Sequence, residues 1–207
     1  EVLSEVEFRD KLLMDLSSRA GNYDAFLLDP LFGWQYADAG WLEPLDAYLD
    51  DPDLTDKGFY QQKDFIQTVW EAGKWNLEPL TGLGEGSTWA IPVNTELYVL
   101  AYLTDVFDDL GLSVPETYDE LYATAVKATR PRNGRQIYGF STRAAQYWST
   151  FLVPYGSYFY SYGGRFFDEN LNTVVNESQV VRATEDFVRL LKDAGPPGVL
   201  SFDWHES

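Results

Sequence analysis

The sequence contains no cysteine and only one histidine, His205. The absence of cysteine excludes disulfides, thiol catalysis and cysteine-ligated metal sites. A serine–histidine triad or a histidine-rich zinc site could form only around His205. We therefore predict no metal centre, no cofactor and no hydrolytic activity.

Long apolar runs and basic side chains are also scarce. No apolar stretch approaches the ~20 residues that a membrane-spanning helix needs. Lys and Arg number 15 against 33 Asp and Glu, a formal net charge of −18. Phosphate backbones and anionic membranes repel such a chain, which argues against nucleic-acid binding. The simplest interpretation of the charge is a well-solvated surface.

Aromatic residues are abundant instead. They make up 16% of the chain, with 7 Trp and 14 Tyr, and they are densest between Tyr147 and Phe167. Aromatic faces stack on the C–H faces of sugar rings, but they also fill protein cores. Most of these rings are expected in the core and a minority near a ligand.

Helix caps and hydrophobic periodicity predict helices and strands in alternation. Such alternation is typical of α/β layers with mostly parallel strands. The predicted helices cover 4–19, 32–39, 59–72, 104–110 and 146–162. A further helix follows the capping box Thr117-x-x-Glu120 and is expected to bury Leu121, Tyr122, Ala125 and Ala128, and a last helix follows Asn176. The predicted strands cover 23–28, 89–93, 97–102 and 136–140, with a turn at 131–134, a plain Gly-rich loop at 73–88 and a hairpin at 165–175.

The last predicted helix has the clearest amphipathic pattern. Asn176 is expected to cap its start, although Asn176-Glu177-Ser178 also matches a glycosylation sequon, and Gly195 follows its end. The side chains expected to face inward are Val180, Ala183, Phe187, Leu190 and Leu191.

Three groups of segments occur in an order that is typical of one protein family. The first is YDAFLLDPLFGWQYADAGWLEPLDAYL at 23–49, and the second is AIPVNTELYVLAYLTDVFDDLGLSVPETYDELYATAVKAT at 90–129. The third comprises IYGFS at 137–141, a Trp-bearing helix, Tyr-Gly-Gly at 162–164 and the helix at 177–192. Together they resemble family 1 extracellular solute-binding proteins, the maltose-binding-protein-like group.

The resemblance implies a periplasmic-binding-protein-like α/β fold, with two α/β lobes joined by crossing strands at a hinge. Residues 1–96 are then part of the N-terminal lobe without its first strand and helix. Residues 97–102 are the crossing strand, and 103–207 are part of the C-terminal lobe. Family members run to roughly twice this length, so the resemblance also implies a fragment.

The resemblance further implies a receptor that captures a sugar or oligosaccharide between its lobes. The receptor would deliver this ligand to the membrane permease subunits of an ABC importer. It would lie in the periplasm or outside the cell, with or without a lipid anchor, and it would not be an enzyme.

Six ligand-binding candidates fall in the first half. Asp29 ends a predicted strand, where α/β sheets place ligands, and the resemblance implies hydroxyl contacts there; the alternative is a cap for the next helix. Phe32 and Trp34 share this step, and Trp34 could instead pack under the lobe. The turn before the crossing strand contains Asn94, Thr95 and Glu96. The resemblance implies an acidic or polar ligand contact at Glu96, and the alternative is an ordinary turn with solvated polar groups.

The second half contributes four more candidates. The resemblance implies that Tyr147 and Trp148 stack on a sugar ring, and the alternative for both is a place in the helix core. Arg143 could donate to a hydroxyl or lie exposed. Trp204 is the last candidate.

Two other functions fit some of these residues. A glycosidase uses two carboxyl groups that flank the scissile bond, and Asp29 with Glu96 would be that pair. An extracellular sensor domain can use the same fold for signalling. Incubation with oligosaccharides separates an enzyme from a receptor, because only an enzyme turns the sugar over.

Overall fold

The structure is a computed structural model that describes residues 5–79, 81–145, 148–203 and 206. The chain divides into two compact units, Glu1–Glu96 and Leu97–Ser207. We treat each unit separately. That they correspond to parts of two lobes stays a prediction.

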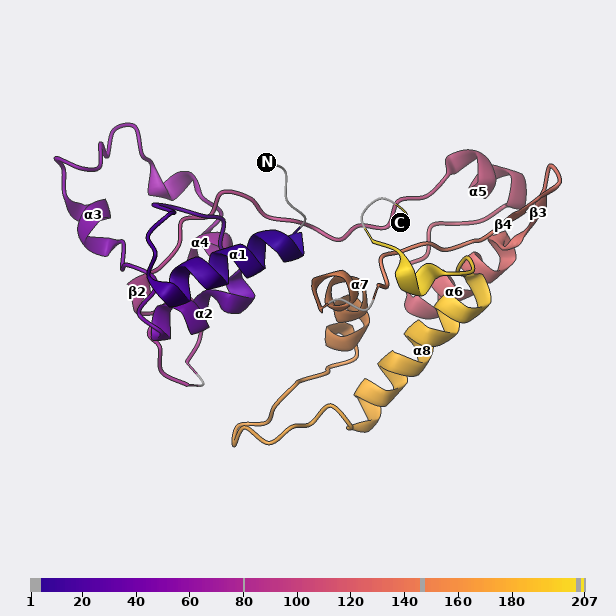
Figure 1. Cartoon of the computed structure of the whole chain (residues 1–207). Coiled ribbons are helices and arrows are strands. Elements are labelled where there is room, and N and C mark those ends of the chain that lie inside the picture. The colour runs from indigo at the N-terminus through magenta and orange to yellow at the C-terminus, as the bar shows by residue number, and fades with distance from the viewer. Residues whose placement is uncertain (1–4, 80, 146–147, 204–205, 207) are drawn as a thin grey trace. The chain divides into compact units, whose positions relative to one another are not determined.

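The first unit consists of short helices around a small hairpin (Figure 1). Its helices are α1 (Glu5–Ser18), α2 (Pro30–Asp38), α3 (Asp46–Asp50), the 3-10 helix η1 (Gln62–Asp64) and α4 (Gln67–Glu71). The hairpin pairs β1 (Lys74–Trp75) antiparallel with β2 (Ser87–Thr88).

The hairpin of the first unit contacts α2 and α3. Asp46, the first residue of α3, accepts hydrogen bonds from the Thr88 N–H and Oγ1, both at 2.8 Å. The buried Trp75 ring stacks on Trp89 with 6.1 Å between centroids, and Trp89 Nε1 donates to the Trp75 carbonyl at 2.8 Å. A Cβ added at Gly33 of α2 would lie 2.8 Å from Trp75, so α2 approaches this ring closely.

The second unit contains longer helices. They are α5 (Thr104–Leu110), α6 (Tyr118–Ala128), α7 (Trp148–Ser161), α8 (Ser178–Ala194) and the 3-10 helix η2 (Val199–Ser201). Between α6 and α7, β3 (Arg130–Arg132) and β4 (Arg135–Ile137) form an antiparallel hairpin.

The core of the second unit lies where α6 and α7 pack on α8. Every inward side chain expected for α8 is buried, and Ala194 extends the same stripe. Thr117 caps α6 through its Oγ1, which accepts from the Glu120 N–H at 3.2 Å. Gly111, with φ of 58°, ends α5 in the left-handed conformation that glycine adopts at little steric cost.

The predicted parallel strands are wrong for the described residues. Residues 23–28, 89–93 and 97–102 have no regular secondary structure, and the only two sheets formed by the described residues are two-stranded and antiparallel. A strand needs a neighbour that accepts its backbone hydrogen bonds. No described segment provides one for these three apolar runs.

Three smaller predictions also need correction. Residues 59–72 form η1 and α4 with a break at Phe65 and Ile66, both extended, where Tyr60, Phe65 and Trp70 cluster. The predicted turn at 131–134 is present at Asn133 and Gly134, but Pro131 and Arg132 belong to β3, and β4 covers only the start of the predicted 136–140 strand. The Gly-rich loop at 73–88 has β1 and β2 at its ends. Turn chemistry alone does not reveal how far strand pairing extends.

The cap of α8 also differs from the prediction. Glu177, not Asn176, occupies the N-cap position, and the exposed Asn176 lies in the preceding turn. The predicted hairpin before it is present as one antiparallel bridge between Phe167 and Thr173. No helix among the described residues is long and apolar enough to cross a membrane.

Candidate functional site

In the first unit, Asp29 lies at the start of α2. Its Oδ1 accepts from the Leu31 N–H at 3.0 Å, so it is the N-cap of this helix, and its Oδ2 lies 4.0 Å from Arg9 of α1. The Arg9 guanidinium also lies over the Phe32 ring at 4.7 Å. Arg9 therefore brings Asp29 and Phe32, two predicted ligand residues, into one cluster.

The aromatic side chains of α2 divide between core and solvent. Phe32 stacks on the buried Tyr36 with centroids 6.2 Å apart, and Tyr36 packs on Trp41. Burial raises the pKa of Tyr36, and the charge of Asp29 adds to the rise while that of Arg9 opposes it. Trp34 is 42% exposed, so part of its indole is accessible to solvent.

The turn residues Asn94, Thr95 and Glu96 are exposed, and the segment around them has no regular secondary structure. The structure shows no contact that brings Glu96 to Asp29. The side-chain carbonyl of Asn94, the hydroxyl of Thr95 and the carboxylate of Glu96 are accessible to a ligand or to water.

In the second unit, Arg143 is buried, with 7% of its surface exposed. Its Nε donates to the Tyr98 hydroxyl at 3.5 Å, and its guanidinium lies over the Tyr98 ring at 5.4 Å. The same hydroxyl shares a 3.3 Å hydrogen bond with Oγ1 of Thr142, which is also buried. We call Tyr98, Thr142 and Arg143 the hydroxyl–guanidinium cluster.

The sequence left open whether Arg143 donates to a hydroxyl or lies exposed. The structure shows that Arg143 is buried and not exposed. Buried guanidinium groups hold up to five N–H donors in one plane, and donors in that arrangement match oxygen acceptors. The cluster therefore brings a guanidinium and two hydroxyls together, and these are groups that hydrogen-bond to oxygen acceptors.

Other candidates fall outside the described part of the chain. Tyr147 and Trp204 are not described, and neither is His205. Trp148 begins α7, but only its backbone is described. Their roles stay predictions.

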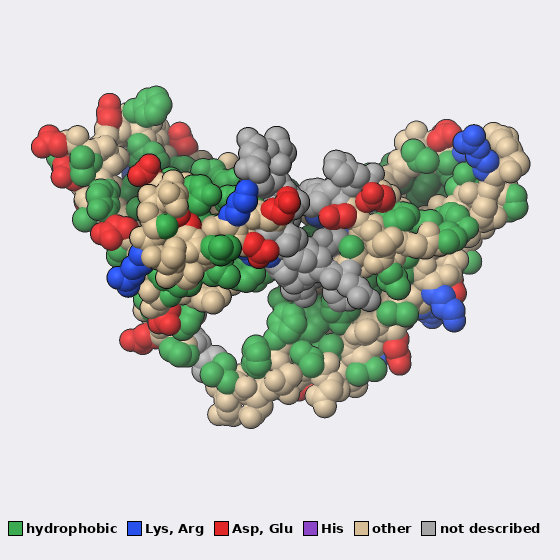
Figure 2. Space-filling view, viewed as in Figure 1, with side chains coloured by type: hydrophobic (Ala, Val, Ile, Leu, Met, Phe, Trp, Pro, Cys, Tyr) green, Lys and Arg blue, Asp and Glu red, His purple; other side chains and the backbone are tan. Residues whose placement is uncertain are grey.

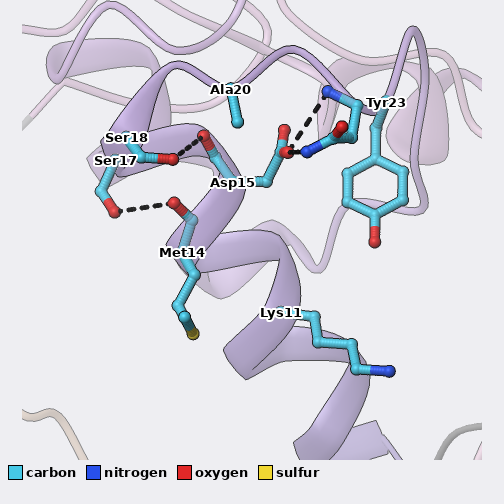
Figure 3. A pocket seen from close by; sticks show the side chains of 8 residues that line it. Lys11, Met14, Asp15, Ser17, Ser18, Ala20 and Tyr23 are labelled. Carbon is cyan, nitrogen blue, oxygen red and sulfur yellow. Dashed lines mark hydrogen bonds between the residues drawn. The ribbon is translucent and has the colours of Figure 1, made fainter.

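An open hollow of about 530 Å³ lies at the C-terminal end of α1 (Figure 3). Lys11, Met14 and Tyr23 contribute to its lining, together with the buried Asp15, whose Oδ1 accepts from the N–H and side-chain amide of Asn22. None of the predicted ligand residues lines it. The carboxylate therefore fixes the turn after α1, and the hollow is separate from the candidate site.

The sequence did not reveal Arg9, Tyr98 or Thr142 as members of the site. Tyr98 sits within an apolar run and looks like a strand residue, and its partner Arg143 lies 45 residues later. A polar ring within an otherwise aliphatic run is the one available signal. Among the described residues, no group of three or more His, Asp or Glu side chains could hold a metal ion.

Comparison with known proteins places this geometry in a family. The model of the family described as "Bacterial extracellular solute-binding protein" matches residues 1–207. An erythritol/L-threitol-binding protein of Mycolicibacterium smegmatis is 28% identical over 99% of this chain and 43% of its own length. A mannitol-binding protein of Pseudomonas aeruginosa is 27% identical over 100% of this chain and 43% of its own length.

Solved structures agree on the fold. A solute-binding protein of an ABC transporter from Agrobacterium vitis, with bound D-mannitol, is 26% identical with a TM-score of 0.71, over 97% of this chain and 44% of that one. A second, from Agrobacterium radiobacter in complex with ribitol, is 22% identical with a TM-score of 0.80, over 100% of this chain and 48% of that one.

The chain thus spans less than half the length of these relatives. Its architecture is an incomplete form of the periplasmic-binding-protein-like fold that they share. The family and these relatives are binding proteins rather than enzymes. The chain belongs to the bacterial extracellular solute-binding proteins.

Proposed function

We propose that the full-length protein is an extracytoplasmic receptor that binds a sugar or sugar alcohol and delivers it to the permease of an ABC importer. The hydroxyl–guanidinium cluster carries this proposal. Its polar groups donate to oxygen acceptors, and buried donors that face a ligand gain more from a hydrogen bond than exposed ones. The relatives named for erythritol, threitol and mannitol support a small, acyclic, polyhydroxylated ligand.

The first unit would add the Asp29 carboxylate, Phe32 and the exposed Trp34, together with the turn at 94–96. Carboxylates accept hydrogen bonds from hydroxyls, and an indole face covers the C–H groups of a polyol chain. Tyr147, Trp148 and Trp204 complete the proposed set. The capture of ligand between two lobes, and a location in the periplasm or outside the cell, stay proposals drawn from the family.

We also propose that the protein does not hydrolyse its ligand. Asp29 already caps α2 with one oxygen and faces Arg9 with the other, so its groups serve a structural and binding role. Incubation with maltose and maltotriose should leave both sugars unchanged by chromatography. Release of glucose, lost in Asp29→Asn, would instead support the glycosidase alternative.

Titration calorimetry of the full-length protein tests the binding proposal with D-mannitol, ribitol, erythritol and maltose. At least one should bind saturably, and Arg143→Met should weaken that binding by at least about tenfold, or ~1.4 kcal/mol. Arg165→Met is the matched control, because Arg165 is an exposed arginine of the same unit. Unchanged affinity in a folded Arg143→Met variant would remove the cluster from the site.

A further inference from the structure

The loop between α3 and α4 presents apolar side chains to solvent. Phe59 is 90% exposed, Leu54 65% and Ile66 66%. An isolated exposed leucine is ordinary, but a nearly fully exposed phenylalanine in a segment with two further exposed apolar side chains is typical of interaction surfaces. The loop therefore presents apolar side chains that a partner could cover.

The backbone of this loop is held by its own side chains. Asp56 Oδ1 accepts from the N–H groups of Gly58 at 2.8 Å and Phe59 at 3.3 Å. Asp51 Oδ1 accepts from the Asp53 N–H at 2.8 Å. Such turns set the backbone at the residues that follow the aspartate, so Phe59 projects from a built turn.

Tyr60, the residue after Phe59, packs inward and holds the turn in place. Tyr60 packs against Phe65 and Trp70, with centroids 5.9 and 6.5 Å away, and Trp70 is buried. Phe59 and Tyr60 are therefore neighbours with opposite surroundings. The Tyr60 ring contributes to the packing of the first unit, and the Phe59 ring is exposed to solvent.

The charge around Phe59 has one dominant sign. Asp50, Asp51, Asp53 and Asp56 precede it, and the nearest base, Lys57, lies 3.5 Å from Asp50. Figure 2 shows acidic side chains gathered around the segment that follows α3. An apolar anchor within carboxylates complements a partner surface that has an apolar pocket and a basic rim.

We propose that residues 50–59, the acidic loop, dock onto a basic surface of the importer's permease subunits, with Phe59 as the anchor. This inference rests on the proposed function. A second copy of a chain with a net charge of −18 would repel the loop, and an anionic membrane surface would do the same. A basic protein surface is the occupant that the charge favours.

The test uses the full-length receptor and the purified importer in nanodiscs. Phe59→Ser should lower receptor–importer affinity by at least about tenfold, as expected for a buried aromatic anchor. It should leave unchanged the melting temperature and the affinity for whichever of D-mannitol, ribitol, erythritol and maltose binds. Asp53→Asn should lower the association rate several-fold, and added salt should weaken the wild type. Leu83→Ser, at an apolar site of the same unit that is 65% exposed, should behave like wild type.

Each other outcome counts against the proposal. Wild-type importer affinity in Phe59→Ser overturns the acidic loop while the receptor function stands. A large drop in melting temperature shows that the rest of the chain covers Phe59, which also overturns it. A wild-type receptor that neither binds any tested ligand nor engages the importer overturns the proposed function together with the docking surface.

Discussion

The two units of this chain bury their apolar side chains in different ways. In the second unit, three helices of 11, 14 and 17 residues bury one shared core. In the first unit, helices of five to nine residues follow α1 and gather around a hairpin with two residues in each strand. Most of the buried apolar side chains among the described residues belong to the second unit.

The difference shows what long amphipathic helices contribute. A helix satisfies its backbone hydrogen bonds internally, so it needs only an apolar partner face. A segment that depends on sheet neighbours has no such independence. The first unit therefore relies on particular close contacts, such as Asp46 with Thr88 and Trp75 with Trp89.

The largest expected effect comes from the core of the second unit. Phe187 is 1% exposed at the centre of α8, and Phe187→Ala should lower the free energy of unfolding by about 3–5 kcal/mol. Val188→Ala on the exposed face of the same helix should change it by less than about 0.5 kcal/mol. Urea denaturation measures both, and equal effects would mean that α8 does not organise the unit.

A smaller effect is expected where the first unit brings two backbones together. A Cβ added at Gly73 would lie 2.3 Å from the Ala90 carbonyl oxygen, whereas one at Gly82 meets nothing within 4 Å. Gly73→Ala should therefore cost about 1–3 kcal/mol through overpacking, and Gly82→Ala should be close to neutral. Thermal melting compares the two, and a stable Gly73→Ala variant would show that the hairpin gives way easily.

The next effect depends on pH and on Asp46. Burial alone would raise the pKa of Asp46, but its hydrogen bonds from Thr88 outweigh this and hold the pKa below its ordinary value. A lowered folded-state pKa stabilises the fold above the unfolded pKa of about 3.9, and this stabilisation is lost as the pH falls through the folded-state value. Asp46→Asn should thus cost roughly 1 kcal/mol at pH 7, after discounting for partial exposure, and progressively less below about pH 4.

Denaturation at pH 7, 5 and 3 measures this dependence, with Asp64→Asn as an exposed control in the same unit. A cost for Asp46→Asn that stays constant across this range would show that packing, and not the charge, matters at Asp46.

The smallest effects concern surface ion pairs. Arg132 of the second unit lies 3.3 Å from Asp105 and 3.1 Å from Asp109, while Lys57 of the first unit has one partner at 3.5 Å. Arg132→Met should cost up to about 1 kcal/mol and Lys57→Met roughly 0.3 or less, both shrinking in 1 M salt. A larger cost for Lys57→Met would reverse the comparison.

Helical structure in the second unit was predictable from local patterns. The stripe from Val180 to Leu191, the Thr117 cap and the Gly111 stop each depend on residues within a few positions of one another. The break at Phe65 was not predictable, since it arises when Tyr60, Phe65 and Trp70 pack together. Aromatic packing there outweighs the helical spacing of the sequence.

The sequence indicated candidate ligand residues by type but not their arrangement, and their role in binding stays a prediction. Asp29 and Arg143 were expected as polar ligands, but Arg9 and Tyr98, which position them, were not. Both pairings join distant parts of the sequence: Arg9 with Asp29 across two helices, and Tyr98 with Arg143 over 45 residues. No local pattern encodes such a contact.

The sequence by itself determined the long helices of the second unit, the Thr117 cap and the family, because these depend on short-range spacing and on motifs in order. It also limited the chemistry, since a chain without cysteine has no thiol chemistry. Only the tertiary structure decided that Asp29 caps α2 and that Arg143 is buried against Tyr98 and not exposed to solvent. It also decided that the apolar runs at 23–28, 89–93 and 97–102 do not pair as strands among the described residues, because a strand exists only when another segment accepts its hydrogen bonds.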